Sequence, residues 1–420
     1  MKAIISKGLL KGTVNVPSSK SLCHRAIIAA CLANGKSIIR NVTYSNDILA
    51  TIEGMKALGA TINRYDEYLE IIGSNVKRIN KVIDANESGS TLRFLIPIAA
   101  TINEDVTFVG KNNLPNRPLD VYFDIFNEQG IKYEYQDKYL PLTISGALHP
   151  GVYNVRGDVS SQFITGLLYA LPLLNGESVI NITTPLESKG YIDLTLDVLK
   201  KFGIIVEKLK KGYKIPGNQK YKPFDYIVEG DFSQAAFYLV ADMLGSEVSL
   251  KQMKLNSLQG DKKILNDIMD FGGLIYYDNE LLSCKRRENK RARINFSQSP
   301  DLGPILSVLA ALSKGKSKFV DVKRLRIKEC DRVSAMEEEL TKLGANVYSN
   351  YDKMKFVGVD ALHGAVVDAH KDHRIAMALA IAGTVCDGDV TILNAECVSK
   401  SYPNFFEDFA SLGGRVRYEE

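Results

Sequence analysis

The chain has 420 residues, of which 45% are hydrophobic and 24% charged, and its formal net charge at pH 7 is +4. This length allows two hydrophobic cores of ordinary size, so two domains are expected. The small positive charge is spread along the sequence, which excludes a strongly basic nucleic-acid scaffold but suits small acidic ligands.

The N-terminal segment and the cysteines exclude further classes. Residues 1–12 are interrupted by three lysines and lack the apolar core of a signal peptide. No apolar run reaches the length of a membrane span. The six cysteines form neither a CxxC pair nor a metal-ligand spacing, which favours reduced thiols. We therefore expect a cytoplasmic protein with no membrane contact and no metal.

Taken in chain order, the sequence repeats one pattern six times. Each repeat is expected to contain an apolar helix, a strand, an amphipathic helix ending at glycine, and two further strands joined by a turn. The glycines lie 69 to 73 residues apart, at Gly59, Gly130, Gly203, Gly272, Gly344 and Gly413. The regular spacing indicates one architecture used six times.

The first helix of each repeat is apolar on nearly every side, as in FITGLLYALPLL at residues 163–174, which predicts a core helix surrounded by strands. Six repeats divide into two domains of three, and the polar stretch 216–231 after the third repeat is the expected crossing point. The sixth repeat is short of strands, whereas residues 1–15 offer spare ones. We predict an N-terminal domain of residues 16–229 and a C-terminal domain of residues 1–15 plus 230–420. The predicted fold class is α/β, with buried helices and outer sheets.

Polar and charged residues stand at the start of every buried helix. The six openings read SSKSLCHR, NESGSTLR, GDVSSQF, GDFSQAA, SPDLGP and HKDHRIA. A helix N-terminus has unpaired N–H groups and a partial positive charge, and anions bind there. If the openings of both domains line one cleft, full charges are added by Lys20, Arg25, Arg93, Arg117, Lys328, Arg332, Arg374 and Lys400.

Each opening by itself has an ordinary structural explanation. Ser or Asp before a helix is most often an N-cap, and a lone Arg is usually a surface charge or half of an ion pair. A lone histidine such as His373 is more often structural than catalytic. The GKS triplets at Gly35 and Gly315 are not P-loops, because the required earlier glycine is missing and both follow a helix. N-caps alone do not explain the joint pattern.

These openings and the segments between them resemble a known family. The segments PSSKSLCHRA, NESGSTLRF, NRPLD, SSQFITGLL, VEGDFSQAAF, PDLGP, RIKECDRVSAMEEELTKLGA and DHRIAMA occur in the order found in 5-enolpyruvylshikimate-3-phosphate (EPSP) synthases. The resemblance covers nearly the whole chain. It implies a two-domain enolpyruvyl-transferase-like fold and transfer of the enolpyruvyl group of phosphoenolpyruvate (PEP) to the 5-hydroxyl of shikimate 3-phosphate, with release of phosphate, on the route to aromatic amino acids. It implies no cofactor, these two small-molecule partners and a monomer.

The resemblance assigns side chains to both substrates, position by position. For shikimate 3-phosphate they are Lys20, Ser21, Arg25, Ser160, Ser161, Gln162, Ser188, Asp301 and Lys328. For PEP they are Lys20, Gly89, Arg117, Gln162, Arg332, Arg374 and Lys400. Guanidinium groups can grip a carboxylate or phosphate through two hydrogen bonds, and glycine lets the backbone approach the ligand.

The resemblance also implies an addition followed by an elimination, through a tetrahedral intermediate. Asp301 is expected to take the proton of the 5-hydroxyl, and Glu329 or Lys20 to handle the proton at the PEP methylene. Neighbouring cations would lower the pKa of Glu329 and oppose a role as acid. The alternative for Glu329 is a salt bridge to Arg332 without any chemistry.

Three positions depart from the common family pattern. Glu87 and Phe94 stand where Asn and Pro are frequent. A Glu near the PEP pocket would weaken the binding of anions, including the herbicide glyphosate, which competes for this site in the family. Arg324 stands where Asn is frequent. Whether this position contacts shikimate 3-phosphate is therefore left open.

Two other functions are weighed against this one. The enzyme that transfers enolpyruvyl to UDP-N-acetylglucosamine shares the fold and PEP, but typically opens with a GAKN-type motif and carries a reactive loop cysteine. Here the opening is SSKS, and no cysteine occurs between Cys31 and Cys284. A non-enzymatic nucleic-acid clamp would carry its basic residues along strands and loops facing the duplex rather than at helix starts.

Overall fold

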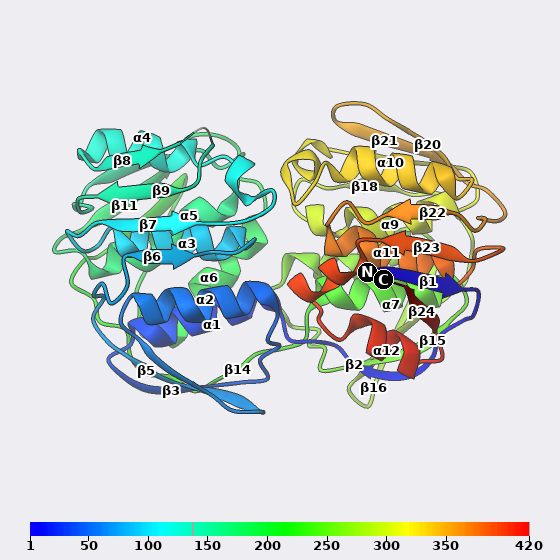
Figure 1. Cartoon of the computed structure of the whole chain (residues 1–420), viewed down its shortest axis with the longest axis horizontal. Coiled ribbons are helices and arrows are strands. Elements are labelled where there is room, and N and C mark those ends of the chain that lie inside the picture. The colour runs from blue at the N-terminus through cyan, green and yellow to red at the C-terminus, as the bar shows by residue number, and fades with distance from the viewer. Residues whose placement is uncertain (137, 420) are drawn as a thin grey trace. The chain divides into compact units, whose positions relative to one another are not determined.

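The computed structural model of the chain describes residues 1–136 and 138–419. These residues form two compact units (Figure 1). Unit 1 consists of Met1–Ser19 and Glu229–Glu420, and unit 2 is Lys20–Val228. The sequence predicted these boundaries after residues 15 and 229.

Unit 2 contains six α-helices and twelve strands among its described residues. The helices are α1 (Lys20–Leu32), α2 (Asn46–Ala57), α3 (Gly89–Ala99), α4 (Asp120–Gln129), α5 (Ser161–Ala170) and α6 (Lys189–Lys201). The strands are β3 (Gly35–Arg40), β4 (Thr61–Arg64), β5 (Tyr68–Gly73), β6 (Val82–Asp84), β7 (Val106–Val109), β8 (Lys132–Tyr135), β9 (Leu142–Ser145), β10 (Val152–Val155), β11 (Ser178–Ile182), β12 (Glu207–Leu209), β13 (Gly212–Ile215) and β14 (Tyr226–Ile227).

Unit 1 also contains six α-helices and twelve strands among its described residues. Its helices are α7 (Phe232–Met243), α8 (Ile264–Asp270), α9 (Gly303–Ala311), α10 (Arg332–Lys342), α11 (His373–Gly383) and α12 (Phe405–Ser411). Its strands are β1 (Lys2–Ser6), β2 (Lys11–Asn15), β15 (Glu247–Lys251), β16 (Gly273–Asp278), β17 (Leu281–Arg286), β18 (Arg293–Asn295), β19 (Lys316–Val320), β20 (Asn346–Ser349), β21 (Lys353–Val357), β22 (Val366–Asp368), β23 (Val390–Leu393) and β24 (Arg415–Glu419).

The strands form six four-stranded sheets of one design. Their orders are β14-β3-β5-β4, β6-β7-β9-β8, β10-β11-β13-β12, β16-β17-β15-β2, β18-β19-β21-β20 and β22-β23-β1-β24. In each sheet the strand after a buried helix pairs parallel with one neighbour and antiparallel with the other. The α/β fold class with six repeated units is confirmed.

The helices that open the repeats are buried, as predicted from their all-round hydrophobicity. All twelve residues of α7 and all eleven of α11 are buried. In α1 every residue after Ser21 is buried. A helix that is apolar on all sides is stable only when other elements cover it, and here sheets and the amphipathic helices do so.

The six repeat glycines end α2, α4, α6, α8, α10 and α12, and all have a positive φ. Gly130 is the C-cap of α4, with φ 70°. Only glycine adopts this conformation without steric cost, which explains why the same residue recurs where each amphipathic helix must stop.

One strand in five of the six sheets was not predicted. The short strands β6, β10, β14, β18 and β22 lie before the buried helices, in segments for which no element was expected. They have two to four residues, such as Tyr226 and Ile227 in β14. Such lengths show no measurable alternation of polar and apolar residues, and pairing with a longer neighbour defines them instead.

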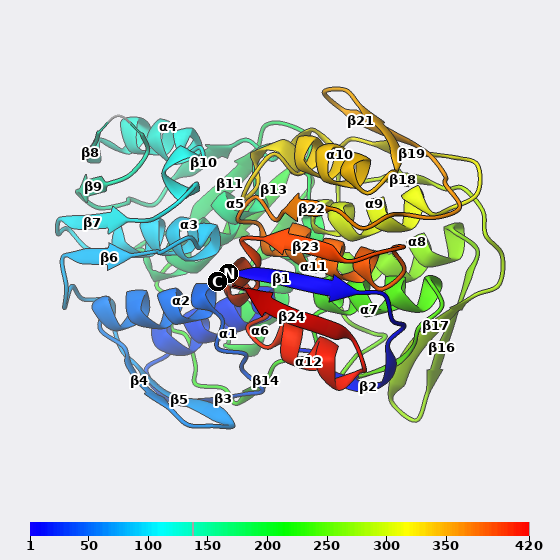
Figure 2. The ribbon, with the colours of Figure 1, turned by 45° about the vertical axis from the view of Figure 1, so that its right-hand side comes forward.

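The N-terminal strands belong to sheets of unit 1. β1 lies between β23 and β24 and is antiparallel to both (Figure 2). It takes the place that the second hairpin strand has in the other sheets. β2 pairs parallel with β15, from Lys11 opposite Glu247 to Asn15 opposite Lys251.

Helices of membrane-spanning length and hydrophobicity are absent from residues 1–136 and 138–419.

A buried histidine makes the stability of unit 2 depend on pH. His24 of α1 is fully buried, with Nδ1 2.7 Å from the Thr51 hydroxyl. Burial lowers the pKa of His24 to about 3. The folded chain therefore holds this ring neutral, whereas the unfolded chain protonates it below about pH 6.5. Its stabilising contribution is complete above pH 6.5 and is lost as the pH falls toward 3.

We expect His24→Asn to reduce this acid sensitivity. Between pH 7 and 4.5 the wild type should lose about 2 to 3 kcal/mol of unfolding free energy through His24, a loss that the variant escapes. Urea unfolding of both proteins at the two pH values measures the difference. His149→Asn, which removes an exposed histidine, is the control. Equal pH dependence in wild type and His24→Asn would contradict the prediction.

Candidate active site

Three helix starts of unit 2 carry the residues predicted to bind substrates. Lys20, Gly89 and Ser161 are the first residues of α1, α3 and α5. The N-cap Ser88 accepts a hydrogen bond from the Thr91 amide, and the cap of α5 does the same for its second residue. Local capping thus fixes where α3 and α5 begin, and their remaining N–H groups stay available for a ligand.

Lys20 has a carboxylate partner that the sequence analysis did not identify. Its Nζ lies 2.7 Å from Oδ2 of Asp47, in the first turn of α2. Both side chains are largely buried, with exposures of 17% and 6%. The pair fixes the ammonium at the start of α1. Asp47 lies 27 residues along the chain, in a segment that reads as an ordinary helix start, so no motif marked it.

Arg25 is buried beneath the start of α1, and its guanidinium is held by protein acceptors. Its Nη1 donates to the Ser21 carbonyl at 2.7 Å and its Nε to the Thr195 hydroxyl at 2.9 Å. Burial lowers the pKa of Arg25. The ring of Phe94 lies 5.2 Å from the guanidinium carbon. Phe94, one of the departures from the family pattern, therefore packs against this cation.

Arg93 links two helix starts. Its Nη1 donates to Oε1 of Gln162 at 2.7 Å, and Gln162 Nε2 donates to the Ser90 hydroxyl at 2.9 Å. These two bonds hold the Gln162 amide between α3 and α5, with its orientation set by its partners. Arg93 was expected only as a wall charge, and the structure adds this positioning contact.

Gly89 and Arg117, both predicted to bind PEP, lie together. A Cβ at Gly89 would be 2.6 Å from Nη1 of Arg117. The absence of a side chain at the first residue of α3 therefore provides the space that the guanidinium occupies. Glu87, another departure, accepts a hydrogen bond from Asn112 Nδ2 at 2.5 Å.

The predicted serines of unit 2 lie at helix starts. Ser161 is buried and follows the cap Ser160. Ser188 is also buried, and it stands at the N-cap position of α6 in the left-handed conformation, with φ 54°. A non-glycine residue in this conformation is uncommon and often marks a functional position.

In unit 1, Asp301 is surrounded by three cations. Its Oδ1 lies 2.8 Å from Arg332 Nη1 and 3.4 Å from Lys328 Nζ, and its Oδ2 lies 3.0 Å from Arg374 Nη2. Asp301 stands in the short turn before α9, whereas Arg332 and Arg374 stand at the starts of α10 and α11. Two repeats thus contribute to one cluster, through the starts of three helices.

The charges of this cluster change the pKa values of its members. Burial alone would raise the pKa of Asp301, but Arg374, Lys328 and Arg332 outweigh it and hold the pKa well below its ordinary value. Burial lowers the pKa of Lys328 to about 8, with Asp301 opposing the shift. Asp301 is therefore a carboxylate at neutral pH, and Lys328 is an ammonium close to its titration range.

Arg332 is the centre of the cluster and is 1% exposed. Besides Asp301, it donates from Nη2 to Glu329 Oε2 at 2.8 Å and from Nε to Asp372 Oδ2 at 2.7 Å. Its three carboxylates raise its pKa well above the ordinary value against the effect of burial. The salt bridge considered as the alternative for Glu329 is present. Lys400 Nζ lies 4.0 Å from the other oxygen of Glu329.

Two buried carboxyls near this cluster were not among the predicted site residues. Asp372 binds Arg332 and also caps α11 by accepting the Arg374 amide at 2.9 Å. Asp261 is fully buried and is bonded to the Ser233 hydroxyl. Burial, with a contribution from Asp301, raises the pKa of Asp261 to about 6. In the sequence, each looks like an ordinary N-cap or a polar loop residue, so neither was predicted to belong to the site.

Arg324, the third departure, is buried in the turn before the cluster. Its Nη1 lies 3.5 Å from the Ser297 carbonyl.

Side chains that could bind a metal ion lie together at another place within the described residues. Glu338, Glu339 and His370 could each offer one atom to a single ion. However, Lys342 Nζ lies 2.9 Å from Glu338 and 3.0 Å from Glu339, and His370 Nε2 lies 2.7 Å from Glu339. The lysine supplies the positive charge there, so these contacts are explained as an ion-pair network.

Both sets of side chains are suited to anions that carry carboxylate and phosphate groups. The set in unit 2 has Lys20, Arg25, Arg93 and Arg117 at helix starts or beside them. The set in unit 1 combines four cations with Asp301 and Glu329, two carboxylates able to accept protons. Fixed cations in a partly buried site bind anions strongly, and a carboxylate among them can act on a neutral hydroxyl.

Comparison with known proteins identifies a family that this chain resembles. A family model described as EPSP synthase (3-phosphoshikimate 1-carboxyvinyltransferase) matches residues 5–409. A 3-phosphoshikimate 1-carboxyvinyltransferase from Clostridium botulinum is 52% identical over 419 residues, covering 98% of this chain and 97% of the relative. One from Clostridium perfringens is 50% identical and covers all of both chains.

A solved structure has the same fold. The EPSP synthase from Acinetobacter baumannii covers the whole chain with a TM-score of 0.82 at 24% sequence identity. With the family model matching nearly the full length and relatives at half identity, the chain belongs to the EPSP synthase family.

Proposed function

We propose that this chain transfers the enolpyruvyl group of PEP to the 5-hydroxyl of shikimate 3-phosphate. A C–O bond forms between the shikimate oxygen and C2 of PEP, and the bond from C2 to the phosphate oxygen breaks. The products are 5-enolpyruvylshikimate 3-phosphate and inorganic phosphate. Family membership supports this reaction, and the observation that carries it in this chain is the carboxylate Asp301 among Lys328, Arg332 and Arg374.

Each unit has its own set of proposed substrate contacts. In unit 2, Lys20, Ser21, Arg25 and the start of α5 receive shikimate 3-phosphate, with Ser188 and, from unit 1, Lys328. PEP is held by Gly89, Arg117 and Gln162 of unit 2 and by Arg332, Arg374 and Lys400 of unit 1. The Gln162 amide is supported by Arg93 and Ser90, so it serves either ligand in a fixed orientation.

Asp301 takes the proton of the 5-hydroxyl as the oxygen attacks C2. In the unloaded site its pKa is low because three cations face it. When the carboxylate and phosphate of PEP bind Arg332 and Arg374, these anions compensate the same charges, and the pKa of Asp301 rises toward a value better suited to a base. Substrate binding thus activates the base.

The PEP methylene gains a proton during addition and loses it during elimination. Glu329 and Lys20 are the groups proposed for this transfer. Glu329 is bonded to Arg332, and its carboxylate oxygens are suited to the proton-accepting half of the cycle. The Lys20 ammonium, held by Asp47, is suited to the donating half.

We also propose that the protein acts as a monomer in the cytoplasm. Its six cysteines are free thiols, which is consistent with a reducing compartment.

An assay of phosphate release tests the proposed function. We expect purified protein to release phosphate only when PEP and shikimate 3-phosphate are both present, since the acceptor hydroxyl must attack before phosphate leaves. Replacing shikimate 3-phosphate by UDP-N-acetylglucosamine should give no release above background. Release with the nucleotide sugar, or retention on DNA without any release, would contradict the proposal in favour of one of the two alternatives.

A further inference from the structure

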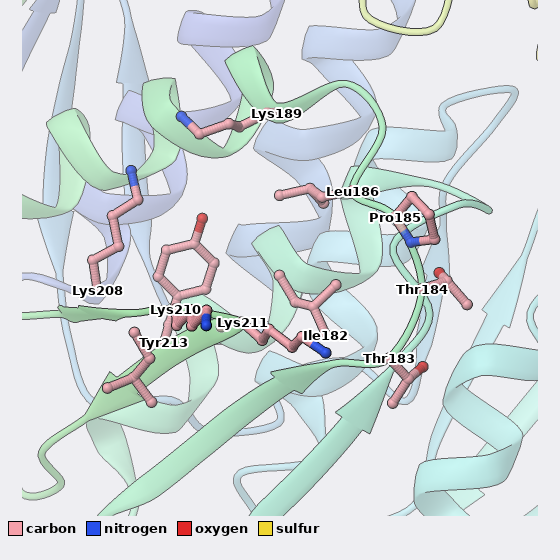
Figure 3. Close-up of a pocket in the computed structure, with 12 residues that line it drawn as sticks. Ile182, Thr183, Thr184, Pro185, Leu186, Lys189, Lys208, Lys210, Lys211 and Tyr213 are labelled. Atoms are coloured by element: carbon pink, nitrogen blue, oxygen red, sulfur yellow. The ribbon is translucent and has the colours of Figure 1, made fainter.

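A cavity of about 470 Å³ lies on unit 2, apart from the residues predicted to bind substrates. Its walls are residues 182–186 after β11, Lys189 at the start of α6, and residues 208–213 of the β12–β13 hairpin (Figure 3). This volume is in the range of sites that hold small organic ligands.

The polar part of the lining is cationic. It includes Lys189, Lys208, Lys210 and Lys211 and contains neither Asp nor Glu. Lys189 is paired with Asp193, whereas the three hairpin lysines have no ion pair in the part of the chain that the structure describes. Like charges gathered around one cavity repel each other, and an anion would relieve this repulsion.

Tyr213 adds a hydrogen-bond donor to the lining. The residue is 2% exposed, and its hydroxyl is not among the buried side-chain atoms that lack a hydrogen-bond partner. Figure 3 shows the ring rising from β13 with the hydroxyl directed toward α6, beside the cavity. Burial raises the pKa of Tyr213 to about 12, so the hydroxyl is a donor at neutral pH. It can donate to an acceptor placed in the cavity.

The rest of the lining is apolar. Ile182, Leu186 and Leu209 contribute aliphatic surface, and the Tyr213 ring adds an aromatic face. An inorganic anion would leave this surface uncovered. The lining therefore suits an organic anion whose charged group accepts from Tyr213 and the lysines while an apolar body covers the aliphatic side chains.

The loop that lines the cavity also leads to Ser188. Within it, the Thr184 hydroxyl accepts from the Gly157 amide at 2.9 Å and from the Asp158 amide at 3.2 Å, and the Glu187 amide donates to the Gly157 carbonyl at 3.1 Å. Residues 157–158 in turn precede the start of α5. A ligand that shifts residues 183–186 therefore acts on two segments that carry predicted substrate contacts.

We propose that this cavity binds a small organic anion with an apolar body, and that its occupant changes the affinity of the chain for shikimate 3-phosphate. The second part rests on the proposed function, because it requires Ser188 and the start of α5 to contact that substrate. Coupling between two ligands is reciprocal, so either ligand can be used to measure it.

Calorimetric titration of the full chain with 3-phenylpropanoate tests the site. We expect saturable binding. The neutral 3-phenylpropanamide should bind at least about 10-fold more weakly, because it has no negative charge to interact with the lysines. Tyr213→Phe should weaken 3-phenylpropanoate binding about 10-fold, the effect of one hydrogen bond to a charged group. The double variant Lys208→Gln/Lys211→Gln should weaken it as well.

Lys220→Gln is the matched control, because it removes an exposed lysine outside the lining. It should leave binding of the probe unchanged. Absence of binding, equal binding of the amide, or equal binding by wild type and Tyr213→Phe would overturn the site. Equal binding by both Tyr213→Phe and the double lysine variant would also show that the probe occupies another anion site.

The coupling is measured by titrating shikimate 3-phosphate with and without saturating 3-phenylpropanoate. We expect the dissociation constant to change about 5-fold or more, the lower range of allosteric couplings. If both ligands bind and neither affects the other, the coupling is wrong. If shikimate 3-phosphate fails to bind in either condition, the proposed function is wrong, and the probe titration alone decides whether the cavity is a site.

Discussion

Asp301→Asn is expected to lower kcat by about 10³-fold, the loss typical of removing a general base. The amide keeps the shape of the side chain but cannot take the proton of the attacking hydroxyl. KM for PEP should not rise, because Lys328, Arg332 and Arg374 remain and face one negative charge fewer. Steady-state kinetics of phosphate release with both substrates varied gives kcat and KM separately.

The split between the two constants distinguishes chemistry from binding. Asp360→Asn, which removes an exposed carboxylate of unit 1, should leave both constants unchanged. Circular dichroism of the Asp301 variant should match that of the wild type. A raised KM with an unchanged kcat would assign Asp301 to binding alone and leave the base unidentified.

Arg332→Met should destabilise unit 1 by about 3 to 5 kcal/mol and abolish measurable turnover. The substitution leaves the carboxylates of Asp301, Glu329 and Asp372 without the guanidinium to which all three are bonded. Uncompensated charges in a buried site are costly, and the remaining cations do not reach every oxygen that Arg332 meets. Arg332→Lys should be intermediate, since a compact ammonium cannot reach three separate carboxylates as the broader, planar guanidinium does.

The destabilisation should also depend on pH with a definite sign. Arg332 is one of the three cations that hold the pKa of Asp301 low. Without Arg332 that pKa rises and protonation of Asp301 relieves the repulsion, so the deficit of the variant should shrink from pH 7 to pH 5. Urea unfolding at both pH values measures it. Arg417→Met, which breaks an exposed pair with Asp389, should cost less than about 1 kcal/mol. A similarly small loss for Arg332→Met would show that the cluster does not depend on its central cation.

Much of the fold could be predicted from the sequence because the same pattern of elements recurs in six repeats. Glycine at the end of each amphipathic helix and the all-apolar helices are strong local signals, and both are confirmed by the structure. The short strands such as β14 were missed, because two residues carry no periodicity and their conformation depends on a partner strand distant in sequence.

The site was predictable to the extent that its charges stand at recurring positions. Asp301 and Arg374 stand in the openings of two repeats, and the structure brings them together with Arg332 in unit 1. Their supporting partners were not predictable. Asp47 and Asp372 look like ordinary residues of helix starts, and only tertiary packing gives them a second contact with Lys20 and with Arg332. Which substrate atoms each side chain meets stays a prediction.

The position of β1 has a consequence for synthesis on the ribosome. β1 is an interior strand of its sheet, yet its partners β23 and β24 are translated only after the whole of unit 2. Unit 2 is one continuous stretch and can fold as soon as it emerges, whereas β1 must wait, unpaired, until β23 and β24 have been made. The only charged residue of β1 is Lys2, so the nascent chain exposes an apolar segment during this time. Closing that sheet therefore follows the synthesis of unit 2 and pairs segments far apart in the sequence.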